Sequence, residues 1–150
     1  MLLASAICSC SEKQPETTEP MITKTEIQVE NGHFTPEIMH RLGKVGDVQV
    51  SPNHAKILYG VTYTSIEQNK GNRELYLMNV DGSENVKITN TPKSESNARW
   101  INDSQIIYMR SGKLYTATIE GSTLKNETEV AGAEGMESFE LSPAGDKLMF

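Results

Sequence analysis

The chain has 150 residues, of which 37% are hydrophobic and 23% are charged, a balance typical of a folded domain. Its formal net charge of -6 argues against nucleic acid as a partner, because a phosphate backbone needs a basic surface. Both cysteines, Cys8 and Cys10, lie near the N-terminus, so we expect neither a disulfide nor a cysteine-bound metal in the folded part.

Residues 1–10 are apolar or small and are too few to span a membrane, which takes about 20 apolar residues. They read as the remnant of a signal peptide and end in Ile7-Cys8-Ser9-Cys10, which resembles a bacterial lipobox with Cys10 as the lipidated residue. The basic segment that normally precedes such a stretch is missing, so we expect the protein to start upstream. The alternative is a frayed apolar terminus without processing.

Residues 11–21 are almost wholly polar and are predicted to form a disordered linker. Residues 22–45 are predicted to lead into the domain with a strand over 22–29 and a short helix. Thr35 is suited to cap that helix, Pro36 to begin it and Gly43 to end it. We expect one apolar face of the helix to dock on the domain, formed by Ile38, Met39 and Leu42.

A hairpin signature recurs along the rest of the chain. It consists of an apolar residue, a polar turn and a short apolar strand, and its copies are Val50–Tyr59, Trp100–Tyr108 and Leu141–Phe150. A period of about 40 to 50 residues with four strands per unit is typical of a β-propeller blade. We therefore predict an all-β fold, a β-propeller fragment of four-stranded antiparallel blades, after the short helix and the disordered tether.

The propeller is predicted to span residues 46–150, with complete blades at 46–90 and 96–131 and the start of a third at 136–150. A closed propeller has typically four to eight blades, so we expect the chain to be the N-terminal piece of a longer protein. Within the first blade, residues 64–72 are predicted to form a long loop.

The pattern apolar-Ser-Pro-x-Gly-x-Lys-apolar-x-Phe at Leu141–Phe150 resembles the repeat of TolB-like propellers, which also occurs in the prolyl oligopeptidase family. The helix and first blade, from Phe34 to Pro52 and through Asn72 to Gly82, resemble bacterial dipeptidyl-peptidase and acylaminoacyl-peptidase-like members. The resemblance implies a propeller that gates an α/β-hydrolase domain, which carries a Ser-Asp-His triad with the serine on a Gly-x-Ser-x-Gly elbow. That motif does not occur in these 150 residues, so no catalytic residue is assigned.

Candidate site residues are few. Three lie in or beside the predicted loop: Glu67 and Glu74, suited to pair with a substrate amine, and Arg73, suited to pair with a carboxylate. The alternative is a solvated loop. The histidines have no cysteine or paired carboxylate at metal-ligand spacing, so we expect no metal and no cofactor.

Two functions are consistent with the sequence. The first is the propeller domain of a secreted serine exopeptidase that hydrolyses short peptides, exported to the periplasm or anchored at the outer membrane of a Gram-negative bacterium. The membrane contact would be made only through the lipid on Cys10. The second is a periplasmic TolB-like propeller that has no catalytic domain and acts through protein partners.

Overall fold

The computed structural model describes residues 20–149. The signal-peptide remnant, the lipidation candidate Cys10 and most of the predicted linker lie outside these residues. Among the residues described, no helix is long and apolar enough to cross a membrane.

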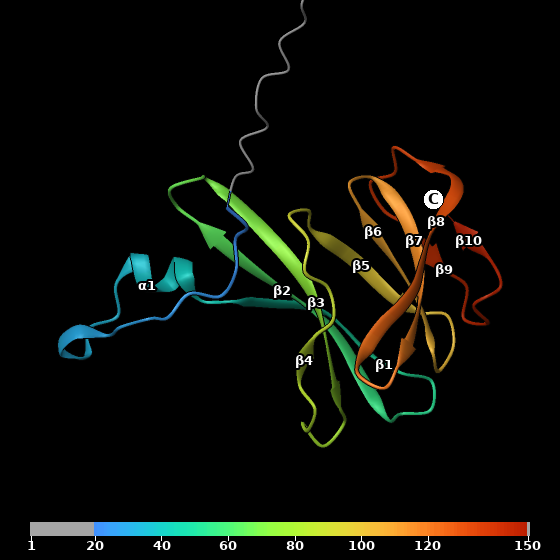
Figure 1. The fold of residues 1–150 in the computed structure, drawn as a ribbon, viewed down its shortest axis with the longest axis horizontal. Helices are drawn as coiled ribbons and strands as arrows, with labels where there is room; N and C mark the ends of the chain where they lie inside the picture. The colour runs from blue at the N-terminus through green and yellow to red at the C-terminus, as the bar shows by residue number, and fades with distance from the viewer. Residues whose placement is uncertain (1–19, 150) are drawn as a thin grey trace, which may run out of the picture.

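The fold is mostly β, as predicted: two four-stranded antiparallel sheets and a two-stranded hairpin follow one another along the chain (Figure 1). The first sheet has the order β1 (Lys44–Val50), β2 (Lys56–Ser65), β3 (Lys70–Asn79), β4 (Val86–Lys87). The second has the order β5 (Glu95–Trp100), β6 (Gln105–Arg110), β7 (Lys113–Glu120), β8 (Thr123–Glu134). The hairpin pairs β9 (Glu140–Leu141) with β10 (Leu148–Met149). Four-stranded antiparallel units in chain order confirm the predicted fold class.

The repeated Ser-Pro turn has the same structure in the first sheet and in the last hairpin. Ser51 Oγ accepts the backbone N–H of Lys56 over 2.9 Å, while Ser142 Oγ accepts that of Lys147 over 3.1 Å. In the second sheet the acceptor is Asn102, whose Oδ1 accepts the backbone N–H of Gln105 over 3.0 Å. These side chains supply the acceptor that the turn backbone lacks.

The tips of two of these turns need a left-handed backbone. His54 has φ 58° and Gly145 has φ 72° at the equivalent place. His54 is exposed at this tip, and a glycine, which has no side chain, takes the equivalent place in the last hairpin. His54 is therefore a turn residue.

β1 and β5 each carry a bulge at the same place in their sheets. The pairing of β1 with β2 shifts between Gly46 and Gln49, around Asp47 with φ 50°. The pairing of β5 with β6 shifts around Asn97 with φ 52°. Bulges with a left-handed residue increase the local twist, so the first strand of each sheet is twisted in the same way.

The apolar faces of the first two sheets form one core between them. It is made of buried residues from both sheets, which are Leu58, Leu75, Leu77, Ala98, Trp100, Ile106, Tyr108, Ala117 and Ile119. A second cluster joins the second sheet to the last hairpin through Ile107, Met109, Leu114, Ala133 and Phe139. Burial of these faces is what holds consecutive sheets together.

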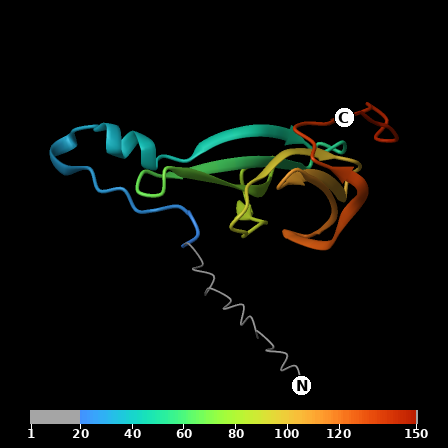
Figure 2. The same ribbon diagram turned by 90° about the horizontal axis from the view of Figure 1, so that it is seen from above.

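The helix is found where it was predicted, but it does not dock as expected. α1 (Pro36–Arg41) begins after Thr35, whose Oγ1 accepts the N–H of Ile38 over 3.4 Å. Ile38 is half-buried, but Met39 and Leu42 remain 51% and 43% exposed, so only part of the predicted face is covered. The helix has fewer than two turns and among the strands contacts mainly β2, which leaves most of its surface in water (Figure 2).

Three strand assignments differ from the sequence prediction. Residues 22–29 form no strand; the segment leads instead to a 3-10 turn, η1 (Glu30–Gly32). The predicted loop 64–72 is mostly strand, because β2 and β3 pair up to Ser65 and Lys70 and leave only the turn 66–69. β8 runs over Thr123–Glu134 and so extends past residue 131, where the second blade was predicted to end. Ladder bonds are made by the backbone, so polar side chains in a projecting hairpin do not end a strand.

Candidate functional site

Glu67 is the one of the three predicted binding residues whose carboxylate is exposed. It stands in the β2–β3 turn, and its Oε2 accepts the hydroxyl of Ser65 over 2.9 Å. Hydrogen bonds from its own backbone N–H and from Ser65 lower the pKa of the Glu67 carboxyl. The side chain is therefore a charged carboxylate at neutral pH, in contact with solvent.

A cleft of about 270 Å³ lies beside this turn. One wall is the segment 20–25, held by a bond from Gln68 Nε2 to the carbonyl of Pro20 over 3.1 Å. The other wall is the turn with Glu67, and Arg41 from the end of α1 also lines the cleft. The lining mixes polar and apolar side chains, and a carboxylate and a guanidinium at one cleft are suited to a small ligand with both charges.

Arg73 lies across the backbone of the first two strands. A Cβ at Gly46 would stand 2.9 Å from its Nη2, so the glycine leaves the space that the guanidinium fills. Arg73 Nη2 is paired with Asp47 Oδ2 over 3.0 Å, and the Arg73 side chain is 21% exposed. Its charge is thus balanced within the sheet, and this arrangement braces β1, β2 and β3.

Glu74 is buried and receives several donors. Its Oε2 accepts the hydroxyl of Thr89 over 2.9 Å, and its Oε1 accepts Asn72 Nδ2 and the backbone N–H of Thr91, each over 3.2 Å. Burial raises the pKa of Glu74. Glu74 fastens the linker after β4 to the sheet, where no solvent-borne ligand reaches it.

The sequence analysis missed Glu95, the other buried carboxyl of the sheet junction. It is 0% exposed, its Oε1 lies 2.7 Å from Thr91 Oγ1, and its Oε2 has no hydrogen-bond partner among the described residues. Burial raises the pKa of Glu95 to about 7, with the neighbouring charge of Glu74 acting in the same direction. No pattern flagged it, because Glu95 stands in a stretch that was expected to link two blades.

Two charged residues of the second sheet, Arg110 and Glu127, lie next to these buried carboxyls. The Arg110 guanidinium binds both carboxylate oxygens of Glu127, with Nη1 to Oε2 at 3.1 Å, and it lies 4.2 Å from the ring centre of Tyr115. Tyr108 also bonds to Glu127. Arg110 is 3.7 Å from Glu95 Oε1, which is too long for a hydrogen bond.

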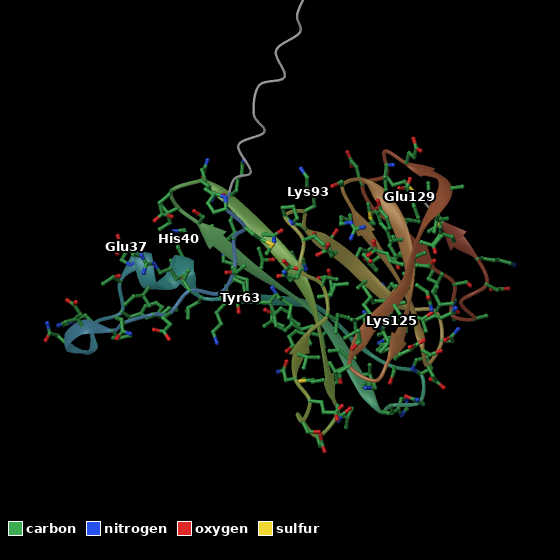
Figure 3. The ribbon with its side chains drawn as sticks, viewed as in Figure 1. Glu37, His40, Tyr63, Lys93, Lys125 and Glu129 are labelled. Atoms are coloured by element: carbon green, nitrogen blue, oxygen red, sulfur yellow. The ribbon has the colours of Figure 1, made fainter. Side chains whose placement is uncertain are left out.

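Beside this group lies a cleft of about 390 Å³, lined by residues 88–91 of the linker and 124–127 of β8. Figure 3 marks Lys125 on the β8 wall. Thr89 and Thr91 line it and also bond to the buried carboxyls. Within residues 20–149, no three acidic, histidine or cysteine side chains converge as a set of metal ligands. The junction therefore places threonine hydroxyls at the edge of a cleft, with buried carboxyls directly behind them.

No known family model matches the chain. Two curated relatives do, both named dipeptidyl-peptidase 5. The protein from Porphyromonas endodontalis is 27% identical over 131 residues, which cover 84% of this chain and 19% of the relative. The protein from Porphyromonas gingivalis is 33% identical over 81 residues, or 54% of this chain and 12% of the relative. The chain thus spans a fifth or less of the relatives it matches, and it is a distant, partial homologue of dipeptidyl-peptidase 5.

Proposed function

We propose that this chain is the N-terminal propeller portion of a secreted serine exopeptidase of the prolyl oligopeptidase family, which hydrolyses short peptides. The observation that carries the proposal is the similarity to dipeptidyl-peptidase 5 over 84% of the chain. Two four-stranded sheets in chain order, with a short helix before them, are consistent with such a domain. The catalytic serine, aspartate and histidine are assigned to a domain outside these residues.

In this proposal the sheets do not perform the chemistry but control which substrates arrive. A propeller over a catalytic domain admits small or unfolded peptides and excludes folded proteins by size. The packed core between the first two sheets supports this role, because a gate must keep its shape. Lipidation at Cys10 and a periplasmic or outer-membrane location belong to the same proposal.

Among the predicted binding residues, Glu67 is the one we assign to substrate contact. An exopeptidase must hold the charged amino terminus of its substrate, and a carboxylate is the group suited to it. Glu67 is ionised and exposed at a cleft, whereas Arg73 and Glu74 are committed to Asp47 and the Thr89–Thr91 linker.

A second function, a TolB-like propeller that binds protein partners, is favoured by one observation. Large apolar side chains are exposed along α1 and β1, and they are Phe34, Met39, Leu42, Val45, Val48 and Val50. Such a strip is suited to a protein surface. It is equally suited to the packing of a neighbouring sheet of the same protein, so the strip does not outweigh the similarity to dipeptidyl-peptidase 5, and the peptidase is preferred.

The deciding experiment is fluorophosphonate labelling of the full-length protein, followed by assay on dipeptidyl substrates. The peptidase proposal expects one labelled serine outside residues 1–150 and release of dipeptides. Absence of both would leave the binding propeller as the function. The 150 residues by themselves should hydrolyse nothing. Glu67→Gln should raise KM for peptides with a free amino terminus, whereas exposed Glu137→Gln should not.

A further inference from the structure

The hydroxyl of Thr91 has more acceptors around it than it has protons. Thr91 Oγ1 lies 2.6 Å from the carbonyl oxygen of Lys93 and 2.7 Å from Glu95 Oε1, both within hydrogen-bond length. It also accepts the backbone N–H of Lys93 over 3.2 Å. A threonine hydroxyl carries one proton and donates one such bond. A carbonyl oxygen cannot donate, so one of the two short contacts needs a proton from elsewhere.

Glu95 is the group that can supply this proton. If Glu95 is a neutral carboxylic acid, its O–H donates to Thr91 Oγ1 and the threonine donates onward to Lys93. If Glu95 is ionised, two oxygen acceptors face each other at 2.6 or 2.7 Å with no hydrogen between them. Only the neutral acid satisfies both contacts.

The surroundings offer an ionised Glu95 few hydrogen-bond donors. Its Oε2 has no hydrogen-bond partner among residues 20–149, and the nearby hydroxyl of Thr89 donates to Glu74 and accepts from the N–H of Leu75. A buried carboxylate without donors is costly. The neighbouring Glu74, with three donor groups, is the better place for the negative charge of the junction.

Charged and titratable groups from several elements act on Glu95 directly or contact the groups that do. Glu74 comes from β3, Tyr108 and Arg110 from β6, Tyr115 from β7 and Glu127 from β8. Arg110 is the cation among them, and it is held in two bonds by Glu127 and stacked on Tyr115. Its charge is largely balanced there, while Glu74 opposes ionisation of Glu95.

We propose that Glu95 is a neutral carboxylic acid in the folded protein and that its ionisation releases the linker between the first two sheets, which makes this junction sensitive to pH near neutrality. Ionisation of Glu95 directly affects the linker residues 88–93. Loss of the Glu95 proton breaks one of the Thr91 contacts, and Thr91 also holds the linker to Glu74 through its backbone N–H. Because residues 88–91 form one wall of the 390 Å³ cleft, release of the linker alters that cleft. Burial raises the pKa of Glu95 to about 7, so its ionisation falls within the pH range in which the protein can be studied.

The test is amide hydrogen exchange of the full-length protein, measured by mass spectrometry on peptides that cover residues 88–95. Rates are corrected for the intrinsic effect of pH. In the wild type, protection of this linker should fall about tenfold between about pH 6 and pH 8, because the ionised form opens more readily. In Glu95→Gln, whose amide donates to Thr91 at every pH, protection should stay constant. The exposed Glu137→Gln is the matched control and should behave as the wild type.

Each outcome decides the proposal. Linker protection that is independent of pH in the wild type overturns it whatever the variants do, so the test holds even if Glu95→Gln fails to fold. A pH dependence that persists in Glu95→Gln, or that disappears in Glu137→Gln, also overturns it. The readout is exchange in residues 88–95, so it does not depend on the peptidase proposal.

Discussion

The backbone N–H of Asn97 donates to Oδ2 of Asp47 over 3.1 Å, and this bond joins the bulge of β5 to the bulge of β1. The same Asp47 oxygen pairs with Arg73 over 3.0 Å. One carboxylate of β1 thus contacts both β3 of the first sheet and β5, the first strand of the second. β1 and β5 contact each other here, at the junction of the two sheets.

Removal of this carboxylate should weaken the junction of the two sheets. Asp47→Ala leaves the N–H of Asn97 without its acceptor and the half-buried Arg73 without its paired carboxylate, at a cost of roughly 1–3 kcal/mol in the free energy of unfolding. Asp47→Asn keeps an oxygen acceptor and tolerates φ 50°, so it should cost less. Urea unfolding of the three proteins measures the difference, and equal stability of Asp47→Ala and the wild type would contradict it.

The guanidinium of Arg73 needs the space over Gly60 as well as the charge of Asp47. A Cβ at Gly60 overlaps the guanidinium of Arg73, whereas a Cβ at Gly71 meets Thr62 Cγ2 at a tolerable 3.3 Å. Gly60→Ala should therefore destabilise the protein by roughly 1–3 kcal/mol and Gly71→Ala by much less. In the Arg73→Ala background, the effect of Gly60→Ala should shrink. An unchanged effect in that background would mean that Arg73 is not the obstacle.

The two serines of the repeated turn should differ in their effect on stability. Ser51 is 1% exposed and its Oγ accepts two backbone N–H groups, so Ser51→Ala leaves these donors unsatisfied in the interior, at a cost of about 1–3 kcal/mol. Ser142 makes equivalent bonds in a more exposed turn, and water can replace its oxygen. Thermal unfolding should show a larger loss for Ser51→Ala than for Ser142→Ala.

Peptidase activity of the full-length Ser51→Ala protein, where folded, should equal that of the wild type. Loss of fluorophosphonate labelling in this variant would instead give Ser51 a chemical role.

Stability should depend on pH through Glu95. Its pKa is raised to about 7 in the folded protein, so the folded state keeps a proton that the unfolded state has already lost. The contribution of Glu95 to the free energy of unfolding therefore falls as the pH rises from about 4.5 to about 7 and is constant above that. Glu95→Gln should be more stable than the wild type at about pH 8 by roughly 1–3 kcal/mol. At about pH 5 this advantage should be lost.

The core between the sheets should be sensitive to cavities. Leu75 is 0% exposed and packs among side chains of both sheets, so Leu75→Ala should cost about 2–5 kcal/mol. Val80 lies just past the same strand and is 54% exposed, and Val80→Ala should change stability by less than about 0.5 kcal/mol. Chemical denaturation of both variants checks the pair.

The sequence by itself determined the all-β class, the hairpin turns and the helix start at Pro36, because these depend on short-range chemistry. Ser51, Thr35 and the apolar strands act on neighbours within a few residues. The similarity to dipeptidyl-peptidase 5 likewise follows from the order of residues alone.

Only the tertiary structure decided where the strands end and which carboxyls are buried. Backbone pairing carries β2 and β3 through polar residues up to Ser65 and Lys70, where composition predicted a loop. Glu67 and Glu74 come from one hairpin, yet one is exposed and the other is covered by the linker of the next sheet. Glu95 gives no signal in the sequence, because its burial and its missing donors arise only when the second sheet packs against the first.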